Sequence, residues 1–223
     1  MKIDLHVHTS KHSQCGVSSP AEMVQAAIAC GLDAIVLAEH DYMWQEEELA
    51  DLQGRFPEIK IFSGVEVSID VAEHIVVIGV EDRQLLSPFM APADLVAAVC
   101  SHRGAAILAH PFRWAPSVRK DIQDVQLDAI EIFSNSIRNY MQQPIRDLQR
   151  KLRLPFVASS DGHHTKQLGL YAIDLQHPAQ DGKDLARMIR HGQFSILTNP
   201  QRIDEINEII PAETKKLSKP TES

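Results

Sequence analysis

The sequence lacks the features that mark disulfide-rich secreted proteins and membrane-spanning proteins. Its 223 residues include only three cysteines, an odd number that argues against a disulfide framework. A run of about eighteen apolar residues, as a transmembrane helix needs, is absent, and no cleavable leader is apparent. We therefore expect a cytoplasmic protein with no membrane partner.

Positive charge is also scarce. Lys and Arg number 22 against 30 acidic residues, which gives a formal net charge of −8. Broad nucleic-acid binding normally needs a basic face, so this balance disfavours such a partner but leaves room for a local basic pocket. Histidine, by contrast, is abundant, with 11 residues.

Short β-rich apolar runs alternate with amphipathic segments, which is typical of an α/β fold with a mainly parallel sheet, open or closed into a barrel. The runs are Ile3–Val7, Ala34–Leu37, Ile59–Val67, Ile75–Val80, Ala105–Leu108, Ala129–Ile132, Phe156–Ala158 and Tyr171–Leu175. Helices are expected between them, over Pro20 to a stop at Gly31, Met43–Gln53, Ala93–His102, Asn139–Leu152 and Asp184–Arg190. We expect one domain over residues 1–200 and a poorly ordered tail over 201–223.

One link departs from this alternation. The segment from Ser68 to Glu73 is too short for the helical crossover that parallel neighbours require. It predicts an antiparallel hairpin that returns His74 to the side of Glu66.

Imidazole and carboxylate side chains stand where the predicted strands end. His6 and His8 have the i,i+2 spacing that points both side chains to one face of a strand. Because active sites of α/β folds lie at the carboxyl ends of strands, these positions predict one cluster. The candidate metal ligands are His6, His8, His40, Glu66, His74, His110, Asp161 and His163.

Mixed His and carboxylate ligands suit Zn²⁺, Mn²⁺ or Fe rather than Mg²⁺ or Ca²⁺. The candidates exceed what one ion needs, so we expect two to three divalent transition-metal ions with Glu66 as the bridge. Such ions lower the pKa of a shared water and provide a hydroxide for hydrolysis.

Six motifs that contain these residues resemble, in order, the motifs of the polymerase and histidinol phosphatase (PHP) family. They are Asp4-Leu5-His6-Val7-His8-Thr9, Ala38-Glu39-His40-Asp41, Gly64-Val65-Glu66-Val67, Glu73-His74-Ile75, Leu108-Ala109-His110-Pro111 and Ser160-Asp161-Gly162-His163. The resemblance covers roughly residues 1–175 and implies a distorted (β/α)7 barrel, a trinuclear metal site and phosphoesterase activity.

The resemblance also implies how the ligands are shared. One ion is held by His6, His8, Glu66 and Asp161, and a second by Glu66, His74 and His110. A third takes His40, His163 and one ligand from the loop after the first motif. The family usually offers Asp or His in that loop, whereas this chain has Gln14 and Cys15. Cys15 as a thiolate, or His12, is a candidate replacement. A third ion that is weakly held or absent is the other possibility, and weak occupancy is the favoured expectation.

Other side chains are candidates for substrate binding and catalysis. Arg113 is predicted to clamp a phosphate because a guanidinium fork matches phosphate oxygens, with Arg138 and Lys166 as weaker choices. Asp4, Glu39 and Asp41 are interpreted as groups that orient the ligand imidazoles, and Glu39 is also a candidate proton donor to the leaving group. Trp44 and Trp114 are candidates for stacking on a base or ring.

These observations favour a metal-dependent hydrolase that cleaves a phosphate monoester of a small metabolite or nucleotide. The alternative is a phosphodiesterase or exonuclease acting on nucleic acid ends. An amidohydrolase-type enzyme is disfavoured because Glu66, not a carbamylated lysine, holds the bridging position. A degenerate, non-catalytic binding module would have lost several ligands, whereas only the position near Cys15 departs from the pattern.

Overall fold

The computed structural model of the chain describes residues 1–203. Its strands are β1 (Lys2–Val7), β2 (Ala34–His40), β3 (Lys60–Ser68), β4 (His74–Ile78), β5 (Ala105–Ala109), β6 (Ala129–Phe133), β7 (Phe156–Ala158), β8 (Tyr171–Leu175) and β9 (Phe194–Thr198). Its helices are α1 (Pro20–Ala29), α2 (Glu46–Arg55), α3 (Pro92–Ser101), α4 (Lys120–Gln123), α5 (Gln142–Leu152) and α6 (Gly182–Arg190), with 3-10 turns η1 (Arg83–Leu85), η2 (Asn139–Met141) and η3 (Thr165–Gln167).

The elements agree closely with the sequence-based expectations. Every predicted apolar run coincides with one of the strands β1 to β8, and the predicted helices overlap α1, α2, α3, α5 and α6. Ser19 caps α1 as predicted, in a capping box with Glu22. The expected tail over 201–223 lies outside the described residues except for 201–203, which are helical. Within residues 1–203, every helix is too short or too polar to cross a bilayer.

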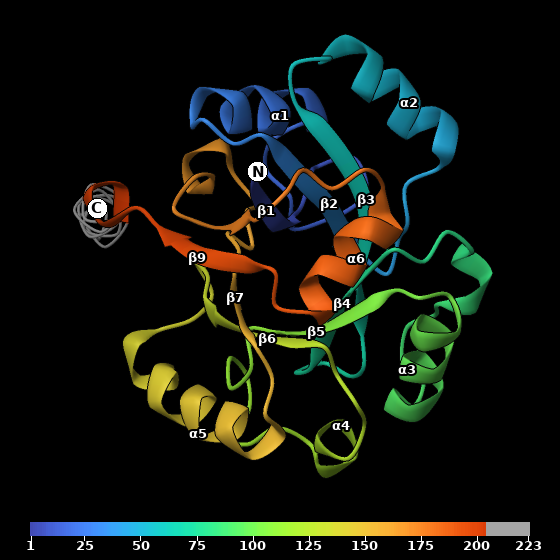
Figure 1. Ribbon diagram of the computed structural model, residues 1–223, viewed down its shortest axis with the longest axis vertical. Coiled ribbons are helices and arrows are strands. Elements are labelled where there is room, and N and C mark those ends of the chain that lie inside the picture. Colours follow the sequence, from blue (N-terminus) through green and yellow to red (C-terminus); the bar gives the residue numbers. More distant parts are fainter. Residues whose placement is uncertain (204–223) are drawn as a thin grey trace, which may run out of the picture.

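The strands form one nine-stranded sheet that curls into a nearly closed barrel, with the order β7-β6-β5-β4-β3-β2-β1-β8-β9 (Figure 1). β8 pairs with the first residues of β1, while the end of β1 meets the segment after β7 through a bridge between Val7 and Gly162. That bridge is supported by the amide of His8, which donates to the carbonyl of Gly162 at 2.9 Å. The expected α/β barrel is confirmed, but the count of seven β/α units is not.

Strand direction decides which residues reach the site. β1, β2 and β3 are parallel neighbours, as are β5, β6 and β7, but β4 runs antiparallel to both β3 and β5. The predicted hairpin is present, with His74 paired to Ser68. Because β4 is reversed, its first residue lies at the same rim as the carboxyl ends of its neighbours.

The interior of the barrel is filled by small and medium apolar side chains. Along β2, Ala34, Val36 and Ala38 point inward, whereas Ile35 and Leu37 pack outward against α1 and α2. The inner cluster also takes in Leu185, Ala186, Met188 and Ile189 of α6. The helix is packed so closely that a Cβ on Gly79, just after β4, would lie 2.9 Å from Cβ of Ala186. α6 therefore closes the end of the barrel opposite the ligand-bearing rim (Figure 1).

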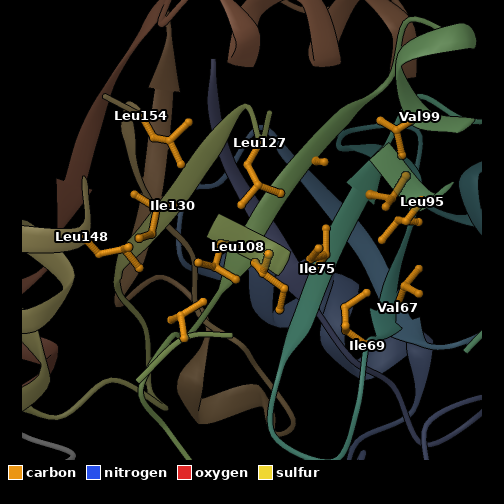
Figure 2. Close-up of a cluster of buried hydrophobic side chains, with 14 of the residues drawn as sticks. Val67, Ile69, Ile75, Leu95, Val99, Leu108, Leu127, Ile130, Leu148 and Leu154 are labelled. Atoms are coloured by element: carbon orange, nitrogen blue, oxygen red, sulfur yellow. The ribbon is translucent and has the colours of Figure 1, made fainter. Parts of the chain in front are cut away.

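A second apolar layer lies between the outer face of β3 to β7 and helices α3, α4 and α5. Leu95 and Val99 of α3 and Leu148 of α5 pack there against Leu108 and Ile130 of the sheet (Figure 2). Burying side chains of this size stabilises the fold by about 1.5–3 kcal/mol each. This layer fixes the strands whose ends carry the candidate ligands.

Candidate metal centre

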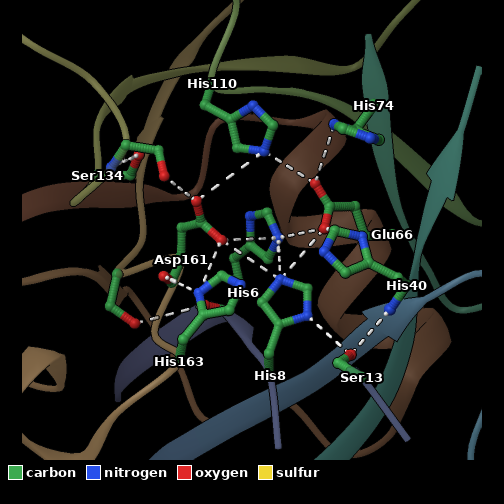
Figure 3. Close-up of polar contacts among 12 residues, drawn as sticks. His6, His8, Ser13, His40, Glu66, His74, His110, Ser134, Asp161 and His163 are labelled. Atoms are coloured by element: carbon green, nitrogen blue, oxygen red, sulfur yellow. Dashed lines mark hydrogen bonds and ion pairs between the residues drawn. The ribbon is translucent and has the colours of Figure 1, made fainter. Parts of the chain in front are cut away.

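All eight predicted ligands lie at one rim of the barrel and point toward one another (Figure 3). His6 lies in β1 and Glu66 in β3, both with fully buried side chains. The other six lie at strand ends or in the loops that follow strands. These are His8 after β1, His40 at the end of β2, His74 at the start of β4, His110 after β5, and Asp161 and His163 after β7.

A first group of four ligand atoms surrounds a common centre. Nε2 of His8 lies 3.0 Å from Nε2 of His6, 3.1 Å from Oε2 of Glu66 and 3.3 Å from Oδ1 of Asp161. Nε2 of His6 is 3.3 Å from the same Glu66 oxygen. Nε2 of His6 lies 3.7 Å from Oδ1 of Asp161. Ligands about 2.0–2.2 Å from a tetrahedral ion are separated by about 3.3–3.6 Å. These distances are close enough to that spacing for the four atoms to share one ion.

A second group uses the other oxygen of Glu66. Oε1 lies 2.9 Å from Nε2 of His110 and 3.6 Å from Nδ1 of His74. The second oxygen of Asp161, Oδ2, is 4.0 Å from Nε2 of His110. Glu66 thus stands between the two groups. Its Oε1 faces His110 and His74, while its Oε2 faces His6 and His8 and also lies 2.9 Å from Nδ1 of His40.

The polar atoms of these groups test whether a cation fits between them. Among residues 1–203, the buried side-chain atoms without a hydrogen-bond partner include Oε2 of Glu66, Oδ1 of Asp161 and Nδ1 of His74. An unpaired buried polar atom is costly. All three atoms point into the ligand cluster, and cations bound in the two groups would satisfy them. The donor set fits divalent transition-metal ions.

Charge in the cluster agrees with this interpretation. Burial raises the pKa of the Glu66 carboxyl, but the neighbouring imidazoles, His6 foremost, outweigh burial and hold that pKa well below its usual range. Burial also raises the pKa of the Asp161 carboxyl, but the imidazoles of His6 and His8 outweigh burial and lower that pKa. Both carboxylates are therefore ionised and available as ligands.

A third group lies nearer the surface. The ring of His8 stacks on the rings of His40 and His163, with centroids 4.5 Å and 4.4 Å away. Cys15, the predicted thiolate ligand, interacts with both His40 and His163. Burial raises the pKa of its thiol, but hydrogen bonds with His163 and His40 outweigh burial and lower it to about 6. Cys15 thus lies beside both imidazoles of this group, and its role as a ligand stays a prediction.

His12, the other candidate for that position, points elsewhere. Its ring stacks on Tyr42 with centroids 3.9 Å apart, and its Nε2 faces Oε2 of Glu48 at 3.4 Å. Lys11 pairs with the same carboxylate. His12 and Lys11 thus anchor the loop that carries Cys15 to the beginning of α2.

Glu131 is a site residue that the sequence reasoning missed. Its side chain is buried in β6, and Oε1 accepts a hydrogen bond from Nδ1 of His6 at 2.9 Å and another from Oγ of Ser159. Oε2 accepts from the backbone amide of His110 at 2.7 Å. Glu131 therefore orients one ligand through its ring and another through its backbone. In the sequence, the only sign of this role was one acidic residue within the otherwise apolar run 129–132.

Glu39 supports the loop after β1. Its fully buried carboxylate accepts hydrogen bonds from the backbone amide of Thr9 at 3.0 Å and from the hydroxyls of Thr9 and Ser13. Trp44 donates to it from Nε1 at 3.2 Å. Ser13 in turn faces Nδ1 of His8 at 3.2 Å. These contacts favour an orienting role for Glu39 over proton donation.

Asp4 and Asp41 tie backbone segments together at the rim. Asp4 accepts from the amide of Ser160 at 2.9 Å, and burial raises the pKa of its carboxyl to about 6. Asp41 accepts from the amide and the hydroxyl of Ser68 at 2.7 and 2.8 Å. Both carboxylates thus hold backbone segments next to candidate ligands.

Three rim residues have a left-handed backbone conformation that side chains with a Cβ disfavour. They are Asp41 (φ 53°), His110 (φ 24°) and Asp161 (φ 50°), each directly after a strand or within a few residues of its end. Such strain persists only where surrounding contacts impose it, and it clusters at functional sites. Here it turns the chain sharply where the ligands leave the barrel.

Arg113 reaches the cluster from the loop after β5. Its Nη1 lies 3.3 Å from Oδ2 of Asp161, and its side chain is 27% exposed. Ser136 donates to the same oxygen. Both residues line a cavity of about 470 Å³, as do Arg138 and Trp114.

Two predicted substrate contacts are not at this cavity. Trp44 is buried and donates to Glu39, so its predicted role in stacking on a substrate ring is wrong. Lys166 is in η3, and its backbone amide donates to Nδ1 of His164. It is not among the residues that line the cavity.

Comparisons with known proteins agree on one family. Residues 4–149 match the family model described as PHP domain, and residues 143–194 match the model described as PHP-associated. The comparison with curated proteins gave no match.

Several solved structures share the fold at low sequence identity. A two-domain protein from Bacteroides vulgatus, described as containing a predicted PHP-like metal-dependent phosphoesterase, has a TM-score of 0.69 at 16% identity, over 89% of this chain and 65% of that one. PsfC from Pseudomonas syringae has a TM-score of 0.65 at 19% identity, over 95% and 98% of the two chains. A lesion-specific endonuclease from Pyrococcus furiosus has a TM-score of 0.60 at 14% identity, over 87% and 57%. The chain thus spans about two thirds of the Bacteroides protein.

Proposed function

Since this chain belongs to the PHP domain family, we propose that it is a metal-dependent phosphoesterase that hydrolyses a phosphate monoester of a small metabolite or a nucleotide. The observation that carries the proposal is the position of Glu66 between two groups of imidazoles. Its Oε2 lies 3.1 Å from Nε2 of His8, and its Oε1 lies 2.9 Å from Nε2 of His110. A carboxylate with its two oxygens so placed suits a bridge between two ions.

The ligand cluster would hold two to three divalent transition-metal ions, Zn²⁺, Mn²⁺ or Fe. When bound, such ions activate water near neutral pH and neutralise charge on phosphoryl oxygens. The first would take His6, His8, Glu66 and Asp161. The second would take Glu66, His74 and His110. The third would take His40, His163 and Cys15.

Arg113 would bind the phosphate group. Its guanidinium already lies beside Oδ2 of Asp161 at 3.3 Å and is partly exposed to the cavity. The planar fork can contact a phosphate oxygen beside the ligands while Ser136 continues to hold Oδ2 of Asp161. Arg113 would thereby neutralise charge that develops on the phosphoryl group.

Glu39 and Asp41 would serve catalysis by holding the ligand loops in place. Glu39 fixes Ser13, whose hydroxyl also accepts from the amide of His40 at 3.2 Å. Asp41 joins the end of β2 to Ser68 of β3. Neither carboxylate needs to exchange a proton with the substrate in this role.

A phosphodiesterase or exonuclease that acts on nucleic acid ends is the second candidate. The likeness of fold to the Pyrococcus endonuclease and the presence of two arginines at the cavity favour it. The net charge of −8 favours the small ester instead, because a long polyanion would be repelled.

Metal analysis of the purified protein and turnover of two nitrophenyl esters would test the proposal. We expect two or more transition-metal ions per chain and, with Mn²⁺ or Zn²⁺, faster hydrolysis of 4-nitrophenyl phosphate than of its bis ester. The control variant Glu58→Gln, which removes an exposed carboxylate, should match the natural protein. Preference for the bis ester would favour the second candidate. Absence of both metal and turnover would contradict the proposal.

A further inference from the structure

The cavity beside the ligand cluster has more aromatic surface than a phosphate group needs. It lies between the loops that follow β5 and β6, and Asp161 and His163 form its wall toward the ligands. The loop after β5 contributes Trp114, and the loop after β6 contributes Tyr140. With a volume of about 470 Å³, the cavity has room for a ring as well as a phosphate.

Both aromatic side chains are unusually exposed. Trp114 is 62% and Tyr140 74% exposed, although large aromatic rings normally bury most of their surface. The other large apolar side chains that are exposed within residues 1–203 are Val17, Val71 and Phe89. Val17 donates its amide to the carbonyl of His163, Phe89 donates to Ser68 at the end of β3, and Val71 lies in the β3–β4 turn. Of these five exposed side chains, Trp114 and Tyr140 line the cavity, which indicates a ligand surface there.

Positive charge accompanies the rings. The guanidinium carbon of Arg113 lies 4.7 Å from the centroid of the Trp114 ring, in cation–π contact. Arg138 lines the same cavity. In a chain with a net charge of −8, two arginines beside two exposed rings form a local site for an anion that also has a flat apolar part.

We propose that this cavity binds the base of a nucleotide substrate, with the ring stacked on Trp114 and Tyr140 and the phosphate directed to Arg113 and the ligand cluster. The inference rests on the proposed phosphoesterase function and narrows its substrate class. An aliphatic phosphate ester would leave both rings exposed, whereas a base would cover them. Stacking of one base on an aromatic side chain corresponds to about a 5- to 150-fold gain in affinity.

The base could belong to a free mononucleotide or to the terminal nucleotide of an oligonucleotide, since both present the same ring and phosphate. A mononucleotide would fill the cavity alone. A terminal nucleotide would continue past the rim, where Val17, Val71 and Phe89 are exposed. Relative turnover of adenosine 5′-monophosphate and of a 5′-phosphorylated trinucleotide distinguishes these sources.

Binding without turnover gives the decisive test. The protein is freed of metal with a chelator and titrated with adenosine 5′-monophosphate and, separately, with ribose 5-phosphate, which lacks the base. We expect the nucleotide to bind at least about fivefold more tightly and to quench tryptophan fluorescence. Because the chain has two tryptophans and Trp44 is buried, the quenching should come from Trp114.

Matched variants separate the cavity from other exposed rings. In Trp114→Ala and Tyr140→Ala the preference for the nucleotide over ribose 5-phosphate should fall toward one. His177→Ala removes an exposed ring that does not line the cavity, and it should keep the preference. Equal affinity of the natural protein for the two ligands would overturn the inference.

The proposed function is judged by a separate measurement. If the metal-loaded protein cleaves 4-nitrophenyl phosphate but shows no preference for the nucleotide, the inference about the cavity is wrong and the phosphoesterase remains. If nucleotide binding shows the expected preference but no phosphate ester is cleaved, the cavity assignment holds and the proposed activity fails.

Discussion

The ligand cluster has two halves that the chain builds in different ways. The inner half consists of His6, His8, Glu66, His110 and Asp161, whose side chains are at most 1% exposed. The outer half consists of Cys15, His40 and His163, of which the two imidazoles are 32% and 19% exposed. His74 lies between them at 12%.

The difference is one of support. Inner ligands are held by buried partners: Glu131 orients His6 and the backbone of His110, while Arg113 and Ser136 hold Asp161. In the outer half, Cys15 lies on the loop from residue 9 to residue 19, which is fixed by Glu39 and by the contacts of His12 with Tyr42. Preorganised ligands bind an ion without further ordering, so the inner half should bind more tightly than the outer half.

The largest effect is expected from Glu66→Gln. An amide cannot bridge two cations as a carboxylate does, so both inner ions should be weakened together and turnover should fall by more than about 100-fold. Metal content by elemental analysis and initial rates on 4-nitrophenyl phosphate check this outcome. Normal metal content with full turnover would remove Glu66 from the centre of the site.

Glu131→Gln should come next. Loss of the charge that orients His6 is expected to reduce metal affinity or turnover about 10- to 100-fold. The matched control is Asp128→Asn, near the other end of β6, where the carboxylate accepts from the amide of Ala106 instead. Competition with a graded chelator measures the affinity. An equal loss in both variants would mean that Glu131 acts only through stability.

Cys15→Ser should have a smaller effect, confined to the outer half. Removal of the thiolate should cost at most one ion per chain, while the inner ions stay. In cobalt-substituted protein, the thiolate-to-cobalt charge-transfer absorption should disappear in Cys15→Ser and persist in Cys100→Ser, whose cysteine is exposed on α3. Loss of all ions from Cys15→Ser would show that the two halves do not bind independently.

Asp41→Ala should have the smallest effect. It removes two hydrogen bonds to Ser68 and places alanine at φ 53°, which together should lower the free energy of unfolding by about 1–3 kcal/mol. Each kcal/mol corresponds to about 2–4 °C in Tm for a chain of this size, and Asp41→Asn, which tolerates the left-handed conformation, should lose less. Calorimetry tests both. A loss of turnover as large as that of Glu66→Gln would give Asp41 a direct catalytic role.

The sequence predicted most of the fold because its strands are buried on both faces and so appear as continuous apolar runs. β9 escaped prediction because Phe194–Thr198 is only partly buried, and α4 because four residues are too few to show a helical period. The clustering of the eight candidate ligands was predictable because they follow the strand ends. Strand order was not, since periodicity says nothing about which strands are neighbours.

The supporting contacts of the site were harder to predict. Glu131 stood inside an apolar run, and only the cost of burying an unpaired acid could have marked it. Trp44 was expected to face the substrate because it lies close to His40 in sequence, but its indole nitrogen turns inward to Glu39. A loop residue close to a ligand in sequence can point toward the substrate or into the core, and the packing around it determines which.

The apolar side chains of the inner cluster, beneath the ligands, determine from which side a substrate can reach the site. Within residues 1–203, α6 and the small residues of the inner cluster fill the far end of the barrel. For the proposed phosphoesterase, the substrate and both products would therefore use the same entrance, on the side of the ligand-bearing rim. Free phosphate would then compete with the substrate for that entrance, so we expect the product to inhibit turnover.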